Sequence, residues 1–235
     1  MQDQYNPYSS PTFVIEAPAD ARAAFIQKTY LHLAGAVTLF ALILGAIVTL
    51  VPEATMMGLM TRTNLMIVFG LFIVGSWVGQ SWAIRSTSLS WQYAGLGLFV
   101  LVESIVFAPM VYAAAHFMND PLLLPSAILT TMLVFGSLTA YVFISKTDFS
   151  FLGGFLTVAG VATFALIILS MIMGFSLGIL FSYAMVMFAS CYILYDTSKI
   201  MYQYREDQYV AAALGLFASV ALLFWYILRI FMSRD

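Results

Sequence analysis

Residues 29–51 read TYLHLAGAVTLFALILGAIVTLV and contain no Asp, Glu, Lys or Arg. A run of this composition is long enough for one α-helix to cross the hydrocarbon core of a bilayer, which takes about 20 mostly apolar residues. The whole chain has the same character, since 63% of its 235 residues are hydrophobic and only 9% are charged. Soluble domains carry about 25% charged residues. The sequence therefore predicts an integral membrane protein.

Seven stretches are long and apolar enough to span a membrane. They cover residues 29–51, 64–83, 93–115, 124–144, 152–173, 178–200 and 209–232. Strands of a transmembrane barrel alternate between polar and apolar residues, whereas these stretches are apolar on every side. The connections are too short for a soluble domain, which usually needs about 50 residues or more. We expect an all-α membrane protein with one seven-helix transmembrane domain over residues 29–232.

Residues 1–28 are polar and rich in proline, and they lack the basic start and apolar centre of a cleavable signal peptide. We expect them to form a disordered cytoplasmic tail and an interfacial lead-in to the first span. With seven spans, this tail and the even-numbered loops share one side of the membrane. That side carries Arg22, Lys28, Arg85, Lys146, Lys199 and Arg205, against Arg62, Arg229 and Arg234 on the other. The excess predicts a cytoplasmic N-terminus and a C-terminus on the outside. The short loops and compact length favour a multi-pass protein of the cell inner (plasma) membrane. If the last stretch only dips into the membrane, both ends would be cytoplasmic.

Enzyme chemistry has little support in the sequence. The stretch Gly174–Gly178 matches the G-x-S-x-G nucleophile elbow, but it joins two predicted helices instead of a strand and a helix. Cys191 is the lone cysteine, and no Cys or His cluster has the spacing of a metal site. We expect no enzyme activity, no cofactor and no nucleic-acid partner. Gly75 and Gly79 form a G-x-x-x-G pair, which favours close packing between helices of the same chain over dimerisation.

Two acidic residues, Glu103 and Asp196, lie within predicted spans. A charge in hydrocarbon costs several kcal/mol, roughly, so intramembrane acids are candidate functional residues by default. Plainer interpretations stay open: Asp196 has Lys199 at i+3 for an ordinary ion pair, and a protonated Glu103 would serve as a hydrogen-bonding helix contact. Arg229, near the end of the last span, is typical of an interfacial anchor.

Several motifs resemble the Bax inhibitor motif family of membrane proteins. The sharpest is the run from Tyr192 through Tyr195 and Asp196 to Ile200, YILYDTSKI. A polar loop, an Ala-rich helix start at 211–214 and the run LLFWYILRIF over 222–231 follow it. The segment FIQKTY over 25–30 is similar to the family's opening.

The resemblance implies six helices around a central C-terminal one and, in bacterial members, a calcium leak governed by pH. It also implies that Asp196 shares a proton with an aspartate of the seventh helix, a position that falls on Ser219 in this chain. Serine cannot form a pair of carboxylates, so we expect either a different gate or a second acid. Glu103 is the candidate. Counting residues from the cytoplasmic end of each predicted helix places Glu103 at about the depth of Ser219 and Asp196 nearer the surface.

We therefore predict an ion path and pH sensor formed by Asp196, Glu103 and Ser219, with Tyr195, Lys199 and Arg229 in support. Both acids would face the bundle interior, beside a protein-lined route. Two acids do not identify the ion, because oxygen ligands suit calcium, magnesium, manganese and protons alike. The alternative is a non-conducting, stress-protective regulator that binds another membrane protein, such as a membrane protease, through the tail at residues 1–22.

Overall fold

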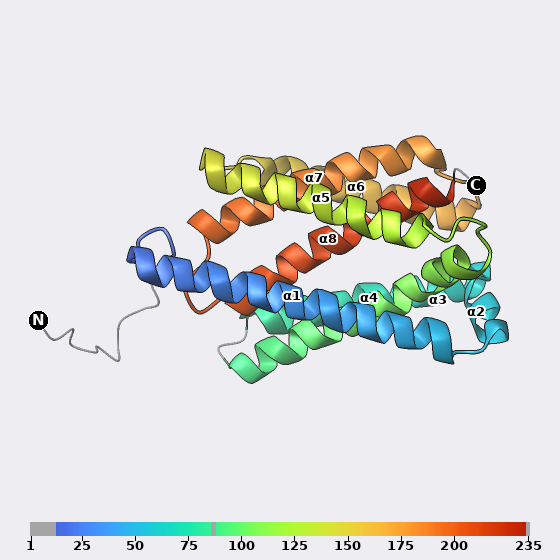
Figure 1. Cartoon of the computed structure of the whole chain (residues 1–235). Coiled ribbons are helices and arrows are strands. Elements are labelled where there is room, and N and C mark those ends of the chain that lie inside the picture. Colours follow the sequence, from blue (N-terminus) through green and yellow to red (C-terminus); the bar gives the residue numbers. More distant parts are fainter. Residues whose placement is uncertain (1–12, 86–87, 234–235) are drawn as a thin grey trace, which may run out of the picture.

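The computed structural model describes residues 13–85 and 88–233, which form eight helices (Figure 1). These are α1 (Ala19–Leu50), α2 (Glu53–Leu59), α3 (Arg62–Arg85), α4 (Leu89–His116), α5 (Leu123–Ser145), α6 (Leu152–Met173), α7 (Gly178–Tyr202) and α8 (Tyr209–Met232). All except α2 are long and apolar enough to cross a membrane. The prediction of an all-α protein with seven spans is confirmed.

The helix bounds differ most from the expectation at the start of the chain. Helix α1 begins at Ala19, ten residues before the predicted span, and residues 13–17 are ordered against the rest of the protein instead of belonging to a free tail. The short helix α2 follows Pro52 and was not expected. Residues 1–12 and Arg234, on which the tail and orientation predictions partly rest, lie outside the described residues.

The long helices form two groups with α8 between them. Helices α1, α3 and α4 pack together on one side, and α5, α6 and α7 on the other (Figure 1). Helix α8 runs at an incline between the groups and contacts α1, α3 and α4 as well as α5 and α7. It is also the most buried of the seven long helices. Groups carried by α8 therefore meet both halves of the bundle.

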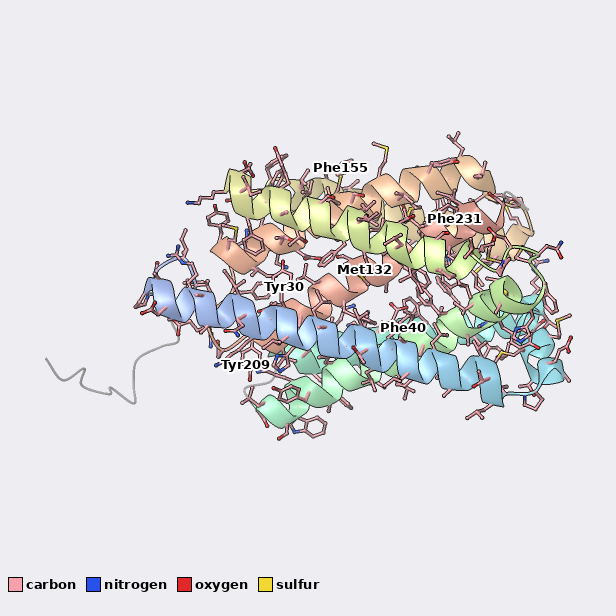
Figure 2. The ribbon with its side chains drawn as sticks, viewed as in Figure 1. Tyr30, Phe40, Met132, Phe155, Tyr209 and Phe231 are labelled. Carbon is pink, nitrogen blue, oxygen red and sulfur yellow. The ribbon has the colours of Figure 1, made fainter. Side chains whose placement is uncertain are left out.

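Aromatic side chains fill the core between α1, α4 and α8. Phe40 meets the rings of Phe107 and Phe217 with centroids 5.1 and 5.7 Å apart. Such edge-on contacts contribute about 0.5–1.5 kcal/mol each beyond the burial of apolar area. Phe155 of α6, labelled in Figure 2, has 60% of its surface exposed. Apolar side chains exposed in this way are the ones that lipid covers.

The motif Gly174–Gly178 forms the connection between α6 and α7, as expected. Gly174 ends α6 with a φ of 76°, a left-handed conformation that glycine adopts without strain. The Arg62 guanidinium of α3 donates hydrogen bonds to the carbonyl oxygens of Met171 and Ile172 in the last turn of α6. A cation at a helix C-terminus is stabilised by the free carbonyl groups there. The glycines therefore have a structural reason that needs no catalytic Ser176.

Helices α3 and α4 touch at their backbones through Gly79 and Gly95. A Cβ atom on Gly95 would lie 2.5 Å from the carbonyl oxygen of Gly79 and 2.7 Å from the amide nitrogen of Ala83. Both distances are far below van der Waals contact, and backbone atoms cannot rotate away. The second half of the G-x-x-x-G pair therefore packs two helices of one chain together, as the sequence analysis favoured.

We expect Gly95→Ala to destabilise the bundle by about 1–3 kcal/mol, because the added methyl group forces α3 and α4 apart. Gly97 lies on the same helix with open space around it, so Gly97→Ala is the matched control and should be neutral or slightly stabilising. Thermal unfolding of the two variants in the same detergent measures the difference. Equal midpoints would show that the contact is not tight in the folded protein.

Candidate functional site

Asp196 and Ser219 meet inside the bundle, between α7 and α8. The Ser219 hydroxyl donates a hydrogen bond to Asp196 Oδ2 at 2.6 Å. Both residues are buried, with 7% and 4% of their surface exposed. A charge-assisted hydrogen bond of this length is among the stronger kinds in proteins. The structure thus places Ser219 against Asp196, at the position where the resemblance implies a second aspartate.

Lys199 lies one helical turn from Asp196 but pairs with it only loosely. Its Nζ atom is 3.9 Å from Asp196 Oδ1, at the limit of an ion pair. The same ammonium group lies over two aromatic rings, 5.1 Å from the ring centre of Tyr195 and 5.2 Å from that of Tyr204. Cation–π contacts of this kind hold a lysine in place while leaving its hydrogen bonds open. Lys199 is therefore shared between the carboxylate and the two rings.

Tyr204, in the connection between α7 and α8, was missed by the sequence analysis. A Cβ atom on Gly215 would lie 3.5 Å from the Tyr204 hydroxyl oxygen and 3.7 Å from Asp196 Oδ1, so both groups converge on that glycine. Burial, followed by the nearby Asp196 charge, raises the pKa of Tyr204. The phenol is therefore neutral at physiological pH. The available sequence signal was the shortness of the six-residue loop between two long helices, which keeps Tyr204 close to the ends of both. We call Asp196, Lys199, Tyr204, Gly215 and Ser219 the carboxylate site.

Glu103 lies on α4 and faces α8, with 7% of its surface exposed. Phe99 and Phe107, one turn before and after it, contact α8 through Phe217 at 6.1 Å and Phe224 at 5.9 Å between ring centres. Among the described residues Glu103 has no hydrogen bond or ion pair. It is thus a buried acid in an aromatic setting.

Helix α8 separates the two acids. Ser219, which contacts Asp196, is two residues after Phe217 and so lies about 200° around the helix from it. Phe217 and Phe224, seven residues apart, share the face toward α4 and Glu103. An α-helix with its side chains is about 10–12 Å across. Asp196 and Glu103 therefore flank α8 on opposite faces, and no hydrogen bond joins them in the described part of the chain.

The depth expected for Asp196 differs from what the structure shows. Counting residues along each helix placed Asp196 nearer the surface than Ser219, whereas the two side chains are in direct contact. The count assumes helices perpendicular to the membrane. Helix α8 is inclined to its neighbours (Figure 1), which changes the residues that meet at a given level. Glu103, between Phe99 and Phe107 on α4, lies level with residues 217–224 of α8.

A second polar link joins the α5–α6 loop to α7, two residues from Asp196. The Asp148 Oδ1 atom accepts hydrogen bonds from the Ser150 amide at 2.9 Å and from the Ser198 hydroxyl at 3.1 Å. The Phe149 amide donates to the Ser198 oxygen at 2.9 Å. The Ser150 amide, with a smaller effect of the Ser198 hydroxyl, holds the pKa of Asp148 below its usual range.

We expect this link to be constant from about pH 5 to 8 and to weaken only as pH falls below about 4, toward the lowered pKa of Asp148. A lowered pKa means that Asp148 stabilises the folded loop above the unfolded value of about 3.9 and stops doing so as pH falls through the folded pKa. Hydrogen exchange of the Phe149 and Ser150 amides, corrected for intrinsic rates, measures the link. Protection that changes between pH 5 and 8 would contradict the assignment.

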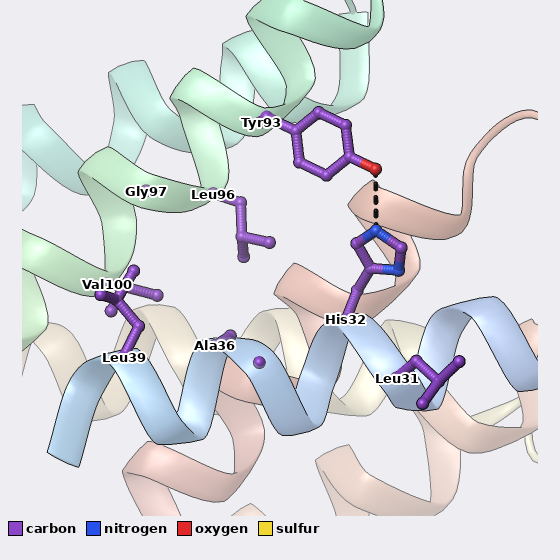
Figure 3. A pocket seen from close by; sticks show the side chains of 9 residues that line it. Leu31, His32, Ala36, Leu39, Tyr93, Leu96, Gly97 and Val100 are labelled. Carbon is purple, nitrogen blue, oxygen red and sulfur yellow. Dashed lines mark hydrogen bonds between the residues drawn. The ribbon is translucent and has the colours of Figure 1, made fainter. Parts of the chain in front are cut away.

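A surface groove lies elsewhere, between α1 and α4. Its volume is about 290 Å³ and most of its lining is apolar. At its polar end His32 Nδ1 donates to the Lys28 carbonyl, and in the neutral ring Nε2 accepts from the Tyr93 hydroxyl at 2.8 Å (Figure 3). None of the residues of the carboxylate site lines this groove. Arg229, half-buried in the last turn of α8, is also remote from that site.

Comparison with known proteins agrees with this architecture. The model of the family described as "Inhibitor of apoptosis-promoting Bax1" matches residues 22–235. Bax inhibitor 1 of Schizosaccharomyces pombe is 29% identical over 229 residues, which cover 95% of this chain and 81% of the yeast protein. Protein lifeguard 4 of Mus musculus is 28% identical over 237 residues, covering 97% and 92%. An uncharacterized protein of Pseudomonas aeruginosa is 31% identical over 165 residues, covering 69% and 70%.

Seven apolar helices around buried polar groups define a multi-pass helical membrane protein. Because the family match extends over nearly the whole chain, the protein belongs to the Bax inhibitor family.

Proposed function

We propose that this protein is a pH-sensitive cation leak channel, with calcium as the cation, in the inner membrane of a cell. The observation that carries the proposal is the buried Asp196 carboxylate, held by Ser219 on a helix that contacts both halves of the bundle. A carboxylate with hydroxyl neighbours offers the oxygen ligands that calcium prefers. A resident calcium site uses six to eight oxygens, so this smaller set suits a cation in transit, which must bind weakly enough to leave.

Protonation of Asp196 is the proposed control of the leak. The protonated acid has no charge to attract a cation, whereas the ionised acid binds cations and strengthens its contacts with Ser219 and Lys199. Glu103, on the opposite face of α8, is the proposed second acid. Because α8 lies between them, a rotation of this helix would change the surroundings of both acids together. The N-terminus would lie in the cytoplasm, as the distribution of Lys and Arg favours.

A flux assay on the purified protein tests the proposal. The protein is reconstituted in liposomes that contain a calcium indicator, and calcium entry is measured from pH 5 to 8, with magnesium, manganese or potassium as competitors. We expect entry that depends on pH and on the protein. Absence of flux at every pH, from protein shown to be folded, would contradict the channel and favour the alternative of a regulator that binds another membrane protein.

A further inference from the structure

Residues 13–17, which precede α1, are packed onto the connection between α7 and α8. The Val14 amide donates to the Tyr204 carbonyl oxygen at 2.9 Å, and Phe13 forms an isolated antiparallel bridge with Arg205. Val14 is fully buried, whereas Phe13 and Ile15 on either side are about half exposed, at 48% and 47%. We call residues 13–17 the strap. Its contact with the loop is specific, because one side chain is buried and its neighbours are not.

Arg22, on the first turn of α1, fastens the strap from the other side. Its Nε atom donates to the Val14 carbonyl at 3.2 Å, and Nη2 donates to the carbonyls of Ile15 at 2.8 Å and Ala17 at 3.4 Å. One guanidinium thus binds three carbonyl groups of the strap. The start of α1 and the α7–α8 connection lie at the same end of the bundle (Figure 1).

Tyr204 connects the strap to the carboxylate site, because it contacts both. The backbone of Tyr204 accepts the strap's hydrogen bond, its ring lies 6.4 Å from that of Phe25 in α1, and its hydroxyl approaches the same glycine as Asp196. Its ring also lies beside the Lys199 ammonium group. The side chain therefore lies beside Asp196 near the strap end of the bundle, at a position that the strap fixes.

We propose that Tyr204 is a gate over Asp196, held closed by the strap, so that release of residues 13–17 opens the site to water and ions. Val14 and Arg22 are positioning residues in this device, since they act through Tyr204. The regulation of flux rests on the proposed function, whereas the accessibility of the site does not.

Labelling of a cysteine at the site tests the gate without a flux measurement. The reporter is Ser219→Cys in a Cys191→Ser background, in lipid nanodiscs that expose both faces, with a membrane-impermeant maleimide as the probe. Adding Val14→Asp places a charge where the side chain is fully buried and should undock the strap. We expect labelling at least about tenfold faster, because a buried thiol reacts in proportion to the open fraction of its cover. Ile15→Asp is the control, with the same charge on an exposed neighbour, and should leave the rate unchanged.

Hydrogen exchange of residues 13–17 shows whether the strap has been released. A released strap with unchanged labelling overturns the proposal, and so does equal acceleration by Ile15→Asp. If Val14→Asp does not fold, Arg22→Gln removes the three hydrogen bonds to the strap carbonyls without changing the core. Hydrogen exchange of the strap and labelling of the cysteine are then measured on that variant. In the flux assay, Val14→Asp should raise calcium entry. Faster labelling with no flux in any variant would support the gate and contradict the channel.

Discussion

Replacing Asp196 with Asn is expected to reduce calcium flux at least about tenfold at pH 7.5 and to make the remainder independent of pH. At an effective dielectric constant of 20, a unit charge attracts a monovalent cation 4 Å away by about 4 kcal/mol, and a tenfold change needs only about 1.4 kcal/mol. Asn has nearly the shape of Asp and still accepts the hydrogen bond from Ser219. The fold should therefore survive while the charge and the titrating group are lost.

Liposome flux from pH 5 to 8 measures this effect, with the thermal unfolding midpoint as a check of folding. Asp120→Asn is the matched control, since Asp120 is an exposed acid in the α4–α5 loop. Flux and pH response equal to those of the unsubstituted protein would remove Asp196 from the mechanism. Glu103→Gln, measured alongside, tests the second acid. If the variant with both substitutions has the same flux and pH response as Asp196→Asn alone, Glu103 does not contribute to the leak.

Replacing Ser219 with Asp should move the midpoint of the pH response upward by at least about one pH unit. The new carboxylate would lie beside Asp196, where the hydroxyl oxygen is now 2.6 Å away. Two carboxylates at such a distance cannot both ionise at low cost, so the pair retains a proton to higher pH. The measured value would belong to the pair and not to either residue.

Ser219→Ala is the control for this substitution, because it removes the hydrogen bond without adding an acid. If the charged form of Asp196 depends on that bond, Ser219→Ala should also move the midpoint upward, but by less than Ser219→Asp. A midpoint that stays in place in both variants would show that the pH response arises at another group. This experiment also tests whether the chain can adopt the carboxylate pair that the family resemblance implies.

The membrane architecture could be predicted from sequence because hydrocarbon imposes a simple rule. Each span needs about 20 apolar residues, and the backbone must bond within its own helix. Stretches such as 152–173 and 209–232 therefore coincide with α6 and α8. The predicted span began ten residues after the start of α1, because residues 19–28 contain polar and charged side chains. A search for apolar runs does not detect the part of a helix that extends beyond the hydrocarbon core. Helix α2 was missed because a seven-residue helix has too few turns to show a pattern.

The candidate site, like the fold, could be predicted from the sequence only in part. Sequence alone identified Asp196 and Glu103 as charges in apolar runs, and it identified Ser219 through family resemblance. It could not place Tyr204, Val14 or Arg22, because a local run of residues does not show which distant segment each of them contacts. Their contacts depend on where the α7–α8 connection returns relative to the start of α1, and such long-range geometry is absent from any local run of residues.

Sequence by itself determined that this chain is a seven-span membrane protein with two acids in its spans, because transfer of each residue from water to hydrocarbon is a local property. Tertiary structure alone decided that inclined α8 separates Glu103 from Asp196, that Ser219 meets Asp196, and that residues 13–17 fasten the loop carrying Tyr204. Those arrangements depend on how the helices pack against one another, and helices of similar hydropathy do not reveal their neighbours by composition. Packing in lipid depends on shape and on a few polar contacts, and both emerge only when the helices are assembled.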